Sequence, residues 1–305
     1  MSEILVVGSV AYDSIATPTG HTDETLGGSA NYFAVAASLY AKVNVVGVVG
    51  EDYQTKDFDI LKTRNVNLDG LQQVKGKTFR WKGQYEGDMN EAITLDTQLN
   101  VFANFSPQLP DSYRKSKYVF LANIDPELQL KVLEQIESPV LVGADTMNYW
   151  IDSKLSTLKV LLKKIDMLLI NEGELRKLTG NWNTIAAVKQ VADMGPKAIV
   201  IKRGEYGFVM YCDKKFFILP AYPVEKVVDP TGAGDTFAGG VFGYLAKTGE
   251  ALNSAHLRQA CVHGCLMASY TVQDFGLGSL KRVTWSDVER RQNEFHEIVS
   301  SSTKA

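Results

Sequence analysis

The chain has 305 residues, of which 45% are hydrophobic and 22% are charged, and its formal net charge is −3. This length is about the upper limit for one hydrophobic core, and the small net charge argues against a protein dedicated to binding nucleic acid or a membrane surface. No uninterrupted apolar run approaches about 20 residues, so we expect no segment that spans a bilayer.

The N-terminal residues and the cysteines bear on the cellular compartment. Residues 1–8 lack a basic region and are typical of a first strand, so we expect no signal peptide. Three cysteines in a chain of this size do not make a disulfide framework. The sequence therefore predicts a cytoplasmic protein.

Short apolar runs alternate with amphipathic stretches along most of the chain. The apolar runs predict strands at Ile4–Val7, Val43–Val49, Tyr118–Ala122, Val140–Gly143, Met167–Ile170, Ala198–Lys202, Phe208–Tyr211, Phe216–Leu219 and Val224–Val228. The amphipathic stretches predict helices at Asn31–Tyr40, Tyr53–Thr63, Glu127–Ile136, Leu155–Lys164, Glu172–Leu178, Thr184–Met194, Asp235–Thr248, Ser254–Tyr270 and Ser286–Ser300. This alternation indicates an α/β fold with a mostly parallel sheet covered on both faces, and ligands at the carboxyl edge of its strands.

Two segments break this alternation. Residues 76–105 show partial apolar–polar alternation without a helical face, which predicts antiparallel strands projecting from the α/β body. Residues 12–27 add one or two short strands. A small β-sheet over an active site at the strand ends would be a lid, and an insertion without function is the alternative.

Residues 229–240 carry the strongest chemical signal and read Asp229-Pro-Thr-Gly-Ala-Gly-Asp235-Thr-Phe-Ala-Gly-Gly240. The backbone of Gly232, Ala233 and Gly234 is open to a ligand, and its N–H groups lie at a predicted helix N-terminus, which favours an anion. Asp235 is fixed at the same place, where the helix dipole keeps it ionised and able to accept a proton. An anion cradle beside a fixed base is what phosphoryl transfer to an alcohol requires. A glycine-rich turn with a capping aspartate is the structural alternative.

This string resembles the C-terminal signature of the ribokinase-like (PfkB) carbohydrate kinases. Four further motifs resemble that family: Gly8-Ser9-Val10-Ala11-Tyr12-Asp13, Gly27-Gly28 before a helix, Asn171-Glu172-Gly173-Glu174, and Lys202-Arg203-Gly204-Glu205-Tyr206-Gly207. The resemblance covers nearly the whole chain. It implies one three-layer α/β/α domain over residues 1–305, with a small β-sheet lid formed by residues 12–27 and 76–105.

The resemblance also implies a role for each matching residue. Asp235 would be the general base, and the amides of Gly232, Ala233 and Gly234 would form the anion hole. ATP and Mg²⁺ would be the cofactors, with Mg²⁺ held through water. The magnesium site would consist of Asn171 and Glu174, and the nucleotide site of these two with Lys202, Gly204, Gly207 and Thr231. The acceptor would contact Asp13, Gly27, Gly28, Tyr32 and Arg80.

Asp229 matches a position that, in many relatives, helps to bind a monovalent cation such as K⁺. A plain turn aspartate before proline is the equal alternative.

Two departures from the family pattern bear on the acceptor. Ala11 stands where ribokinases carry Asn, and an alanine cannot bind a sugar hydroxyl. Tyr32 stands where the family usually carries Asn, and Asn31 is one step earlier, about 100° away around the helix. These departures argue against ribose itself. The first lid segment, residues 13–27, is also shorter than in ribokinases, which weakens the expectation of a homodimer formed through the lid strands.

Arg80 and Lys82 would share one face of a lid strand on either side of Trp81. If this face points to the cleft, the two residues could hold a carboxylate or phosphate of the acceptor. A solvated strand face is the alternative, and Trp81 fits either a cap over the substrate or the core.

The predicted function is an ATP-dependent kinase acting on a hydroxyl of a small sugar, nucleoside or polyol, with no nucleic-acid or membrane partner. An inositol, sugar-acid or sugar-phosphate kinase of the same family, and a non-catalytic ligand-binding protein on this scaffold, are the alternatives. A dinucleotide-dependent dehydrogenase is disfavoured because residues 8–13 lack the repeated glycines of that fingerprint, and no Walker lysine motif is present. Cys261-x-His263-x-Cys265 predicts buried thiols, because residues two apart on a helix do not share a face.

Overall fold

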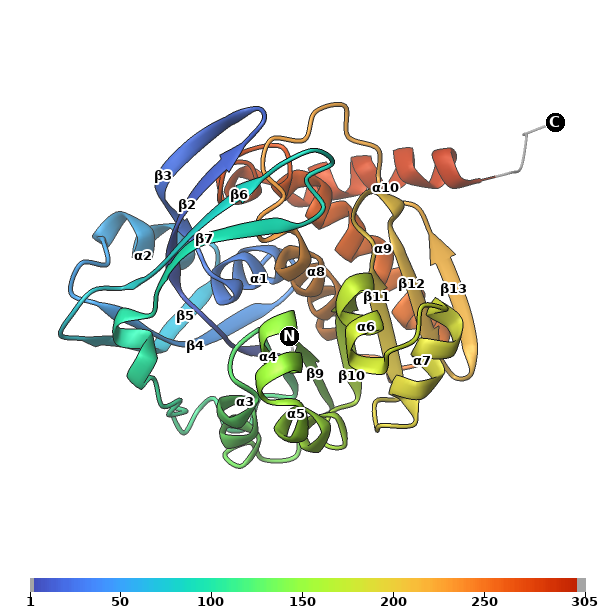
Figure 1. The fold of residues 1–305 in the computed structure, drawn as a ribbon, viewed down its shortest axis with the longest axis horizontal. Coiled ribbons are helices and arrows are strands. Elements are labelled where there is room, and N and C mark those ends of the chain that lie inside the picture. Colours follow the sequence, from blue (N-terminus) through green and yellow to red (C-terminus); the bar gives the residue numbers. More distant parts are fainter. Residues whose placement is uncertain (1–2, 301–305) are drawn as a thin grey trace.

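The computed structural model describes residues 3–300 and has a nine-stranded sheet between two layers of helices, with a separate four-stranded sheet (Figure 1). The strand order of the large sheet is β13-β12-β11-β10-β9-β8-β1-β4-β5. Only β12 runs in the opposite direction to all the other strands of this sheet. The strands are β1 (Glu3–Val7), β4 (Lys42–Gly50), β5 (Val66–Val74), β8 (Tyr118–Leu121), β9 (Leu141–Asp145), β10 (Met167–Asn171), β11 (Ala198–Lys202), β12 (Phe208–Cys212) and β13 (Lys215–Leu219).

Each face of the large sheet carries its own helices and its own buried core. One layer contains α1 (Ser29–Ala37), α2 (Thr55–Lys62), α8 (Ala233–Thr248), α9 (Ser254–Thr271) and α10 (Trp285–Val299). The other contains α3 (Pro126–Leu133), α4 (Asn148–Ser153), α5 (Leu155–Leu162), α6 (Glu172–Thr179) and α7 (Thr184–Ala192). Alternate residues of the strands enter the two cores, because successive side chains of a strand point to opposite faces.

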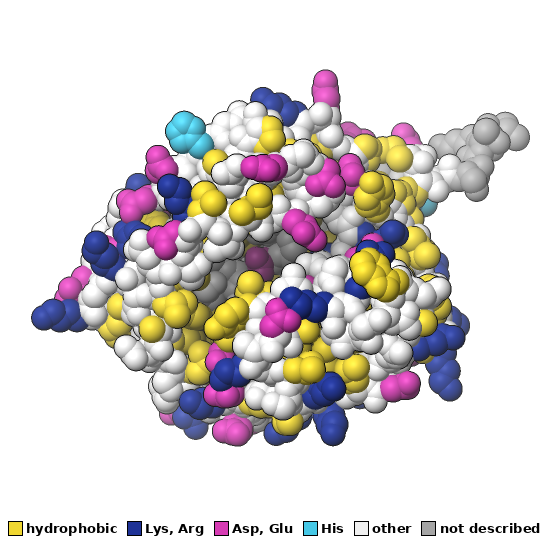
Figure 2. Space-filling view, in the orientation of Figure 1, with side chains coloured by type: hydrophobic (Ala, Val, Ile, Leu, Met, Phe, Trp, Pro, Cys, Tyr) yellow, Lys and Arg dark blue, Asp and Glu magenta, His cyan; other side chains and the backbone are white. Residues whose placement is uncertain are grey.

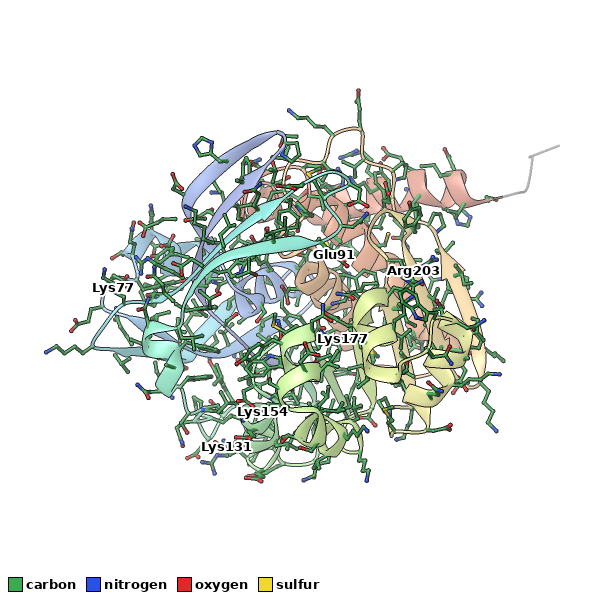
Figure 3. The ribbon with its side chains drawn as sticks, in the orientation of Figure 1. Lys77, Glu91, Lys131, Lys154, Lys177 and Arg203 are labelled. Atoms are coloured by element: carbon green, nitrogen blue, oxygen red, sulfur yellow. The ribbon has the colours of Figure 1, made fainter. Side chains whose placement is uncertain are left out.

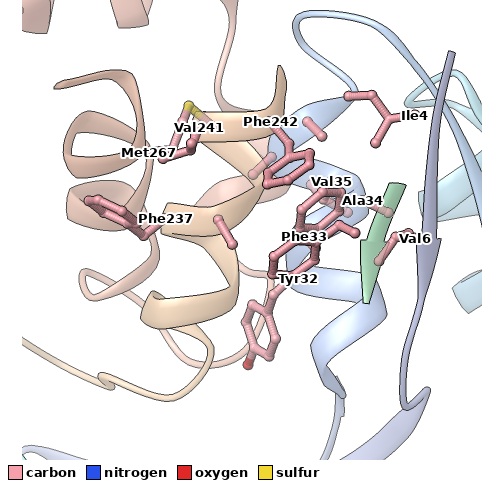
Figure 4. Close-up of a cluster of buried hydrophobic side chains, with 14 of the residues drawn as sticks. Ile4, Val6, Tyr32, Phe33, Ala34, Val35, Phe237, Val241, Phe242 and Met267 are labelled. Carbon is pink, nitrogen blue, oxygen red and sulfur yellow. The ribbon is translucent and has the colours of Figure 1, made fainter. Parts of the chain in front are cut away.

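The position of α8 is fixed by close packing on both of its sides. Phe242 on α8 lies against the ring of Phe33 (Figure 4). Phe242 also contacts Phe120, whose ring stacks on that of Phe33 with 4.6 Å between the centroids. On the side of α9, a Cβ added to Gly240 would lie only 2.8 Å from the Cα of Gly264. Only glycine permits this approach, and it holds the N-terminus of α8 at the carboxyl edge of the sheet.

The small sheet has the strand order β3-β2-β6-β7. Its strands are β2 (Ala11–Thr17), β3 (Gly20–Gly27), β6 (Phe79–Tyr85) and β7 (Ala92–Gln98). The β6–β7 hairpin is antiparallel, as predicted for residues 76–105, and the β2–β3 hairpin is antiparallel too, but the two hairpins are joined by a parallel pairing of β2 with β6. Three short 3₁₀ segments, η1 (Asn100–Asn104), η2 (Gly204–Tyr206) and η3 (Leu280–Arg282), complete the elements of the described residues.

The α/β prediction is confirmed, and every predicted helix is present with its ends shifted by a few residues. The strand predicted at Val224–Val228 is wrong: this segment is irregular, and the Val228 amide donates to the carbonyl of Val272 instead of to a strand. The pattern missed β5 and α4. β5 contains Asn67, Asp69 and Gly70, which disfavour a strand, and it forms by pairing with β4.

The thiols of Cys261 and Cys265 are buried, as predicted, and His263 is buried against Tyr40, with 3.1 Å between Nδ1 and the phenol oxygen. Within residues 3–300, no helix is both long enough and apolar enough to cross a membrane.

Candidate active site

Three neighbouring parallel strands and the start of α8 bring their charged residues to one edge of the large sheet. Asp145 ends β9, Asn171 ends β10 and Lys202 ends β11. Asp235 lies in the first turn of α8. Carboxyl ends of adjacent parallel strands meet at one edge, which is where open α/β sheets bind ligands.

Lys202 and Asp145 form a buried ion pair, with 2.7 Å between Nζ and Oδ2 and side-chain exposures of 17% and 5%. Asp145 and Glu174 hold the pKa of Lys202 above its usual value although burial opposes this. Sequence analysis did not single out Asp145, because its only local signal is a polar residue ending an apolar run.

Two further carboxyl groups, those of Asp235 and Glu174, interact electrostatically with this ion pair. Burial and Asp145 raise the pKa of Asp235 to about 7 against the effect of Lys202, so the expectation that the helix dipole keeps this group ionised is wrong at neutral and lower pH. The same two causes raise the pKa of Glu174 to about 7, again against Lys202. One ammonium group therefore faces three carboxyl groups, and this excess of acid suits a bound cation.

Asn171 and Glu174 bind each other across the first turn of α6. The Glu174 amide donates to Asn171 Oδ1 at 2.8 Å, and the Asn171 amide donates to Glu174 Oε2 at 2.9 Å, which is a capping box. Oε1 of Glu174 and Nδ2 of Asn171 have no hydrogen-bond partner among residues 3–300. The pair is thus positioned by the helix cap, with one carboxylate oxygen free for a ligand.

The first turn of α8 offers unpaired backbone donors. Gly232 precedes the helix with a φ of 74°, a conformation that favours glycine. The amide of Ala233 donates to the Pro230 carbonyl at 3.1 Å, whereas those of Gly232 and Gly234 have no partner within residues 3–300. A Cβ added to Gly234 would lie 3.1 Å from Lys202 Nζ. The turn therefore combines free N–H groups with an adjacent ammonium group, which is an anion site.

Asp13 lies on the other side of the first turn of α8, at the start of the small sheet. It is 4% exposed, and a Cβ added to Gly27 would lie 1.9 Å from its Oδ2, so glycine is required there. Burial and the carboxyl groups of Asp229 and Asp235 raise the pKa of Asp13 to about 8, while the amide of Gly28 opposes the shift. The Asp13 carboxyl group is therefore largely protonated at neutral pH.

Asp229 is bound by its own turn and by the segment around Gly276. Its Oδ1 accepts from the amide of Thr231 at 2.8 Å and its Oδ2 from the amide of Gly276 at 3.1 Å. These bonds support the turn-aspartate interpretation.

Two tyrosines line the same region. The ring of Tyr32 packs on Gly232, where an added Cβ would lie 2.4 Å from its atoms. The hydroxyl of Tyr85, on β6, lies 3.2 Å from Thr231 Oγ1 and so ties the small sheet to the turn before α8. Sequence analysis did not identify Tyr85.

A cavity of about 470 Å³ adjoins the start of α8, and Figure 2 shows a hollow near the middle of this face, with acidic side chains at its rim and inside it. The cavity is lined by Lys202, Gly204, Gly207 and Gly234, and by an apolar wall made of Tyr222, Val224, Val227, Phe237, Ala268 and Val272. A volume of about 300–1,000 Å³ with a mostly apolar lining is typical of small-molecule sites. The sequence analysis did not identify the apolar wall, because its residues are of the same types as those of the hydrophobic core.

The turn between β6 and β7 also reaches this cavity, which it lines with Asp88, Met89 and Asn90. Asn90 lies so close to Gly204 that an added Cβ there would be 2.4 Å from its Oδ1. Figure 3 shows Glu91, at the end of this turn, on the same side of the molecule as Arg203. The turn between β6 and β7 therefore forms part of the cavity wall.

Arg80 is paired within the protein. Its guanidinium contacts Asp52 at 2.8 Å and Glu24 at 3.0 Å, and it lies over the ring of Tyr12. Its side chain is 24% exposed and paired with two carboxylates, whereas Lys82 on the same face is exposed. Trp81 is half-buried and donates to Thr94.

The structure thus gathers most of the predicted site residues into two adjoining groups. The cavity is lined by Lys202, Gly204, Gly207, Ala233 and Gly234, and beside it, around the pair of Lys202 and Asp145, lie Asn171, Glu174 and Asp235. Asp13, Gly27, Gly28, Tyr32, Asp229, Thr231 and Gly232 lie on the other side of the α8 turn. Arg80 belongs to neither group, because its side chain contacts Tyr12, Glu24, Asp52 and Thr78.

Comparison with known proteins gives one family match. The family model described as pfkB family carbohydrate kinase matches residues 1–283. The cytidine kinase of Thermococcus kodakarensis is 29% identical over 246 residues, which cover 79% of this chain and 87% of that protein. The nucleoside kinase of Methanocaldococcus jannaschii is 23% identical over 313 residues, which cover 98% of this chain and 99% of that protein.

Solved structures of similar fold cover nearly all of the chain. The M. jannaschii nucleoside kinase superposes with a TM-score of 0.77, at 22% identity, over 96% of this chain and 99% of that chain. The ribokinase of Cryptococcus neoformans in complex with ADP superposes with a TM-score of 0.76, at 24% identity, over 95% of this chain and 100% of that chain. At these identities the structural likeness establishes the fold alone.

Proposed function

Since the chain belongs to the pfkB family of carbohydrate kinases, we propose that it transfers the γ-phosphate of ATP to a hydroxyl group of a nucleoside, a small sugar or a polyol. The observation that carries this proposal is the position of Asp235, whose pKa is raised to about 7, in the turn that holds the free amides of Gly232 and Gly234. The names of the relatives, a cytidine kinase and a nucleoside kinase, support this acceptor class.

In this proposal ATP occupies the cavity of about 470 Å³. The adenine ring packs on the apolar wall between Tyr222 and Val272. The phosphates point to the amides of Gly232 and Gly234 and to the ammonium group of Lys202, because the helix N-terminus and this charge both favour an anion. The turn between β6 and β7 acts as a lid that excludes water from the donor.

Asp235 acts as the general base. It accepts the proton of the acceptor hydroxyl while that oxygen forms a bond to the γ-phosphorus, and the bond from this phosphorus to the bridging oxygen of ADP breaks. A base with a pKa near the working pH is suited to this transfer. The free amides stabilise the charge on the transferred group, and such electrostatic stabilisation is often the largest contribution to catalysis.

The carboxyl groups beside Lys202 suit Mg²⁺ held through water, since no group of three or more His, Cys, Asp or Glu side chains among residues 3–300 is arranged to hold a metal ion directly. Three carboxyl groups face one ammonium group there, and Oε1 of Glu174 is free for a water ligand. Mg²⁺ keeps several waters and needs only one or two protein carboxylates beside the phosphates. When bound, Mg²⁺ supplies positive charge against the phosphate oxygens. A K⁺ site at Asp229 and a homodimer stay predictions.

The test of the proposed function is release of ADP from Mg²⁺–ATP in a coupled assay, with and without K⁺. The panel contains cytidine and other nucleosides, ribose, fructose, inositol, sugar acids and sugar phosphates. Phosphorylation of a nucleoside, neutral sugar or polyol is the expected result. ATP binding measured by calorimetry, with no ADP release from any acceptor, would contradict it and favour a non-catalytic binding protein.

Exchange of Glu174 for Gln tests the magnesium assignment. Glutamine at this position can keep the capping box with Asn171, because Glu and Gln serve equally in that motif. It removes the carboxylate charge, so the Mg²⁺ concentration at half-maximal activity is expected to rise by about tenfold or more. This is measured as ADP release in a titration of MgCl₂ at saturating ATP.

Glu172→Gln is the matched control. Glu172 is on the same helix turn, but its carboxylate pairs with Arg176 and Arg203. We expect its magnesium dependence to equal that of the wild type. A Glu174→Gln enzyme with an unchanged magnesium titration would rule out Glu174 as a ligand of the metal's water shell.

A further inference from the structure

The face of α9 that borders the donor cavity carries a single hydroxyl group. Cys265, Ala268, Ser269 and Val272 line the cavity, and their spacing places them on one face of the helix. The thiol of Cys265 is bound to the neighbouring loop, because it accepts from the amide of Tyr222 at 3.3 Å. The Ser269 hydroxyl is therefore the polar group that this helix offers to a base packed on the apolar wall.

The direction of both hydrogen bonds at Ser269 is fixed by its partners. Its Oγ lies 2.6 Å from the carbonyl oxygen of Leu266 and 2.6 Å from Nη1 of Arg291. A carbonyl oxygen can only accept, and a guanidinium group can only donate. The single proton of the hydroxyl therefore goes to Leu266, and one of its two lone pairs accepts from Arg291. Ser269 keeps one lone pair for a ligand, so it can accept a hydrogen bond in the cavity but cannot donate one.

Arg291 comes from α10, which packs against α9 (Figure 1). It is 8% exposed, and no carboxylate of residues 3–300 lies within ion-pair distance of it. Its guanidinium lies 3.5 Å from the ring centroid of Tyr270 and 4.9 Å from that of Tyr222, and it also donates to the side-chain oxygen of Gln273. A buried cation without a counter-ion is costly, and an apolar side chain would join the two helices at less cost. The aromatic rings and Gln273 hold this guanidinium where it donates to Ser269.

Purine bases differ in what they present to a group that only accepts. Adenine carries an exocyclic amino group, which donates, whereas guanine and hypoxanthine carry a keto oxygen at the same position, which accepts. A keto oxygen facing Ser269 would bring two acceptors together. Ser269 could turn its proton to that oxygen only by giving up its bond to Leu266, and Arg291 would still occupy one lone pair.

We infer that Ser269 accepts a hydrogen bond from the exocyclic amino group of the donor nucleotide, and that Arg291, acting through Ser269, makes the site selective for ATP over keto-purine triphosphates. This inference rests on the proposed function and specifies the phosphoryl donor within it. Ser269 is the residue that determines specificity. Arg291 is a positioning residue, since it does not line the cavity. The apolar wall binds either kind of purine, so the hydroxyl decides between them.

The test is nucleotide binding measured by calorimetry with Mg²⁺ and without an acceptor, so it does not depend on turnover. The probes are ATP, ITP, in which a keto oxygen replaces the amino group, and purine riboside triphosphate, which has neither group. We expect the wild type to bind ATP about 10- to 100-fold more tightly than ITP, with purine riboside triphosphate between the two. Factors of this size are typical when a buried polar group is left unpaired.

Ser269→Ala removes the accepting oxygen. Its Kd for ATP should rise by about tenfold, to a value close to its Kd for purine riboside triphosphate, and its preference for ATP over ITP should shrink to within about threefold. The substitution should not weaken the binding of purine riboside triphosphate, because this nucleotide has no amino group for Ser269 to bind.

Two substitutions of Arg291 test its positioning role. In Arg291→Met the hydroxyl of Ser269 is free to donate to a keto oxygen, so the ratio of the two Kd values should also shrink, mainly through tighter binding of ITP. A purely structural role of Arg291 would not give this gain for ITP. Arg291→Lys keeps a group that can only donate, so it should retain most of the wild-type ratio.

Ser38→Ala and Arg290→Met are the matched controls. Ser38 makes the same bond to the carbonyl three residues earlier, that of Val35, but it does not line the cavity. Arg290 is next to Arg291 on α10, but its side chain is 56% exposed and pairs with Asp287 and Glu294. We expect both variants to keep the ratio of the Kd values for ITP and ATP within about twofold of the wild type.

Equal affinities of the wild type for ATP and ITP would overturn the inference, and so would a Ser269→Ala protein that keeps the wild-type ratio. An Arg291→Met protein that loses affinity for ATP and ITP by the same factor, or that does not fold while Arg291→Lys folds without the preference, would refute the positioning role. Failure of the proposed function is a different result. A wild type that binds ATP selectively but releases no ADP with any acceptor would contradict that function and leave this inference standing.

Discussion

Asp235→Asn is expected to lower kcat by about 10²- to 10⁴-fold, which is the usual contribution of a positioned general base. Asparagine has nearly the same shape but cannot take the proton of the acceptor hydroxyl. The affinity for ATP, measured by calorimetry, should change little, because Asp235 does not line the donor cavity. Asp193→Asn, at an exposed carboxylate after α7, makes the same charge change and should leave kcat unaltered.

The pH dependence of kcat/KM is a second measurement that tests the role of Asp235. Asp235 must be ionised to act, and its pKa is raised to about 7, so kcat/KM of the wild type should be constant above this pH and fall below it. Glu174 titrates in the same range, so the acidic limb has a slope between one and two. Asp235→Asn should lose one of these two titrations. A variant with kcat within about tenfold of the wild type, and an unchanged acidic limb, would exclude Asp235 as the base.

Lys202→Met is expected to cause the second large loss, in activity and in stability together. The substitution leaves Asp145 buried without its partner, and breaking a buried ion pair in this way typically costs about 3–5 kcal/mol of the free energy of unfolding. It also removes the cation beside the anion site, so kcat/KM for ATP should fall by about 10²-fold or more. Chemical denaturation and the coupled ADP assay measure the two effects.

The same substitution should change both pH profiles. Lys202 lowers the pKa of Glu174 and Asp235, so its loss should move the acidic limb of kcat/KM to higher pH. These two groups have folded-state pKa values of about 7, above those of unfolded carboxyl groups. They therefore favour folding at low pH, and that contribution is lost as the pH rises through about 7. The variant should accordingly be more stable at about pH 5 than at about pH 8.

Two further variants separate stability from catalysis. The double variant Lys202→Met with Asp145→Leu removes both charges, so it should recover most of the free energy of unfolding but none of the activity. Lys197→Met breaks the exposed ion pair of Lys197 with Asp166, next to the start of β11, the strand that ends at Lys202. This variant should change the free energy of unfolding by less than about 1 kcal/mol. Full activity of the Lys202→Met enzyme would refute the proposed role of this lysine at the phosphates.

The lid and the cavity wall show where sequence patterns stop being informative. The alternation in residues 76–105 predicted strands, but the parallel pairing of β2 with β6 depends on a contact between segments about 68 residues apart, Ala11 with Phe79. From the sequence, Arg80 could have bound an acidic acceptor, because its two partners, Glu24 and Asp52, lie on segments distant along the chain. Only the folded chain brings these three charges together.

The sequence by itself determined the α/β class, through its strand and helix periodicities, and the turn at residues 229–240, whose glycines and aspartate have a local conformational meaning. It also indicated Asp13, Asn171 and Glu174, because each lies next to a recognisable local motif. The tertiary structure alone decided the pairing of Lys202 with Asp145, the burial of the Tyr32 hydroxyl and the apolar wall of the cavity. The physical reason is the distance along the chain over which each effect acts. Periodicity and turn chemistry act over a few residues, whereas Asp145 on β9 and Lys202 on β11 are 57 residues apart and are brought together by the sheet, in which only β10 separates their strands.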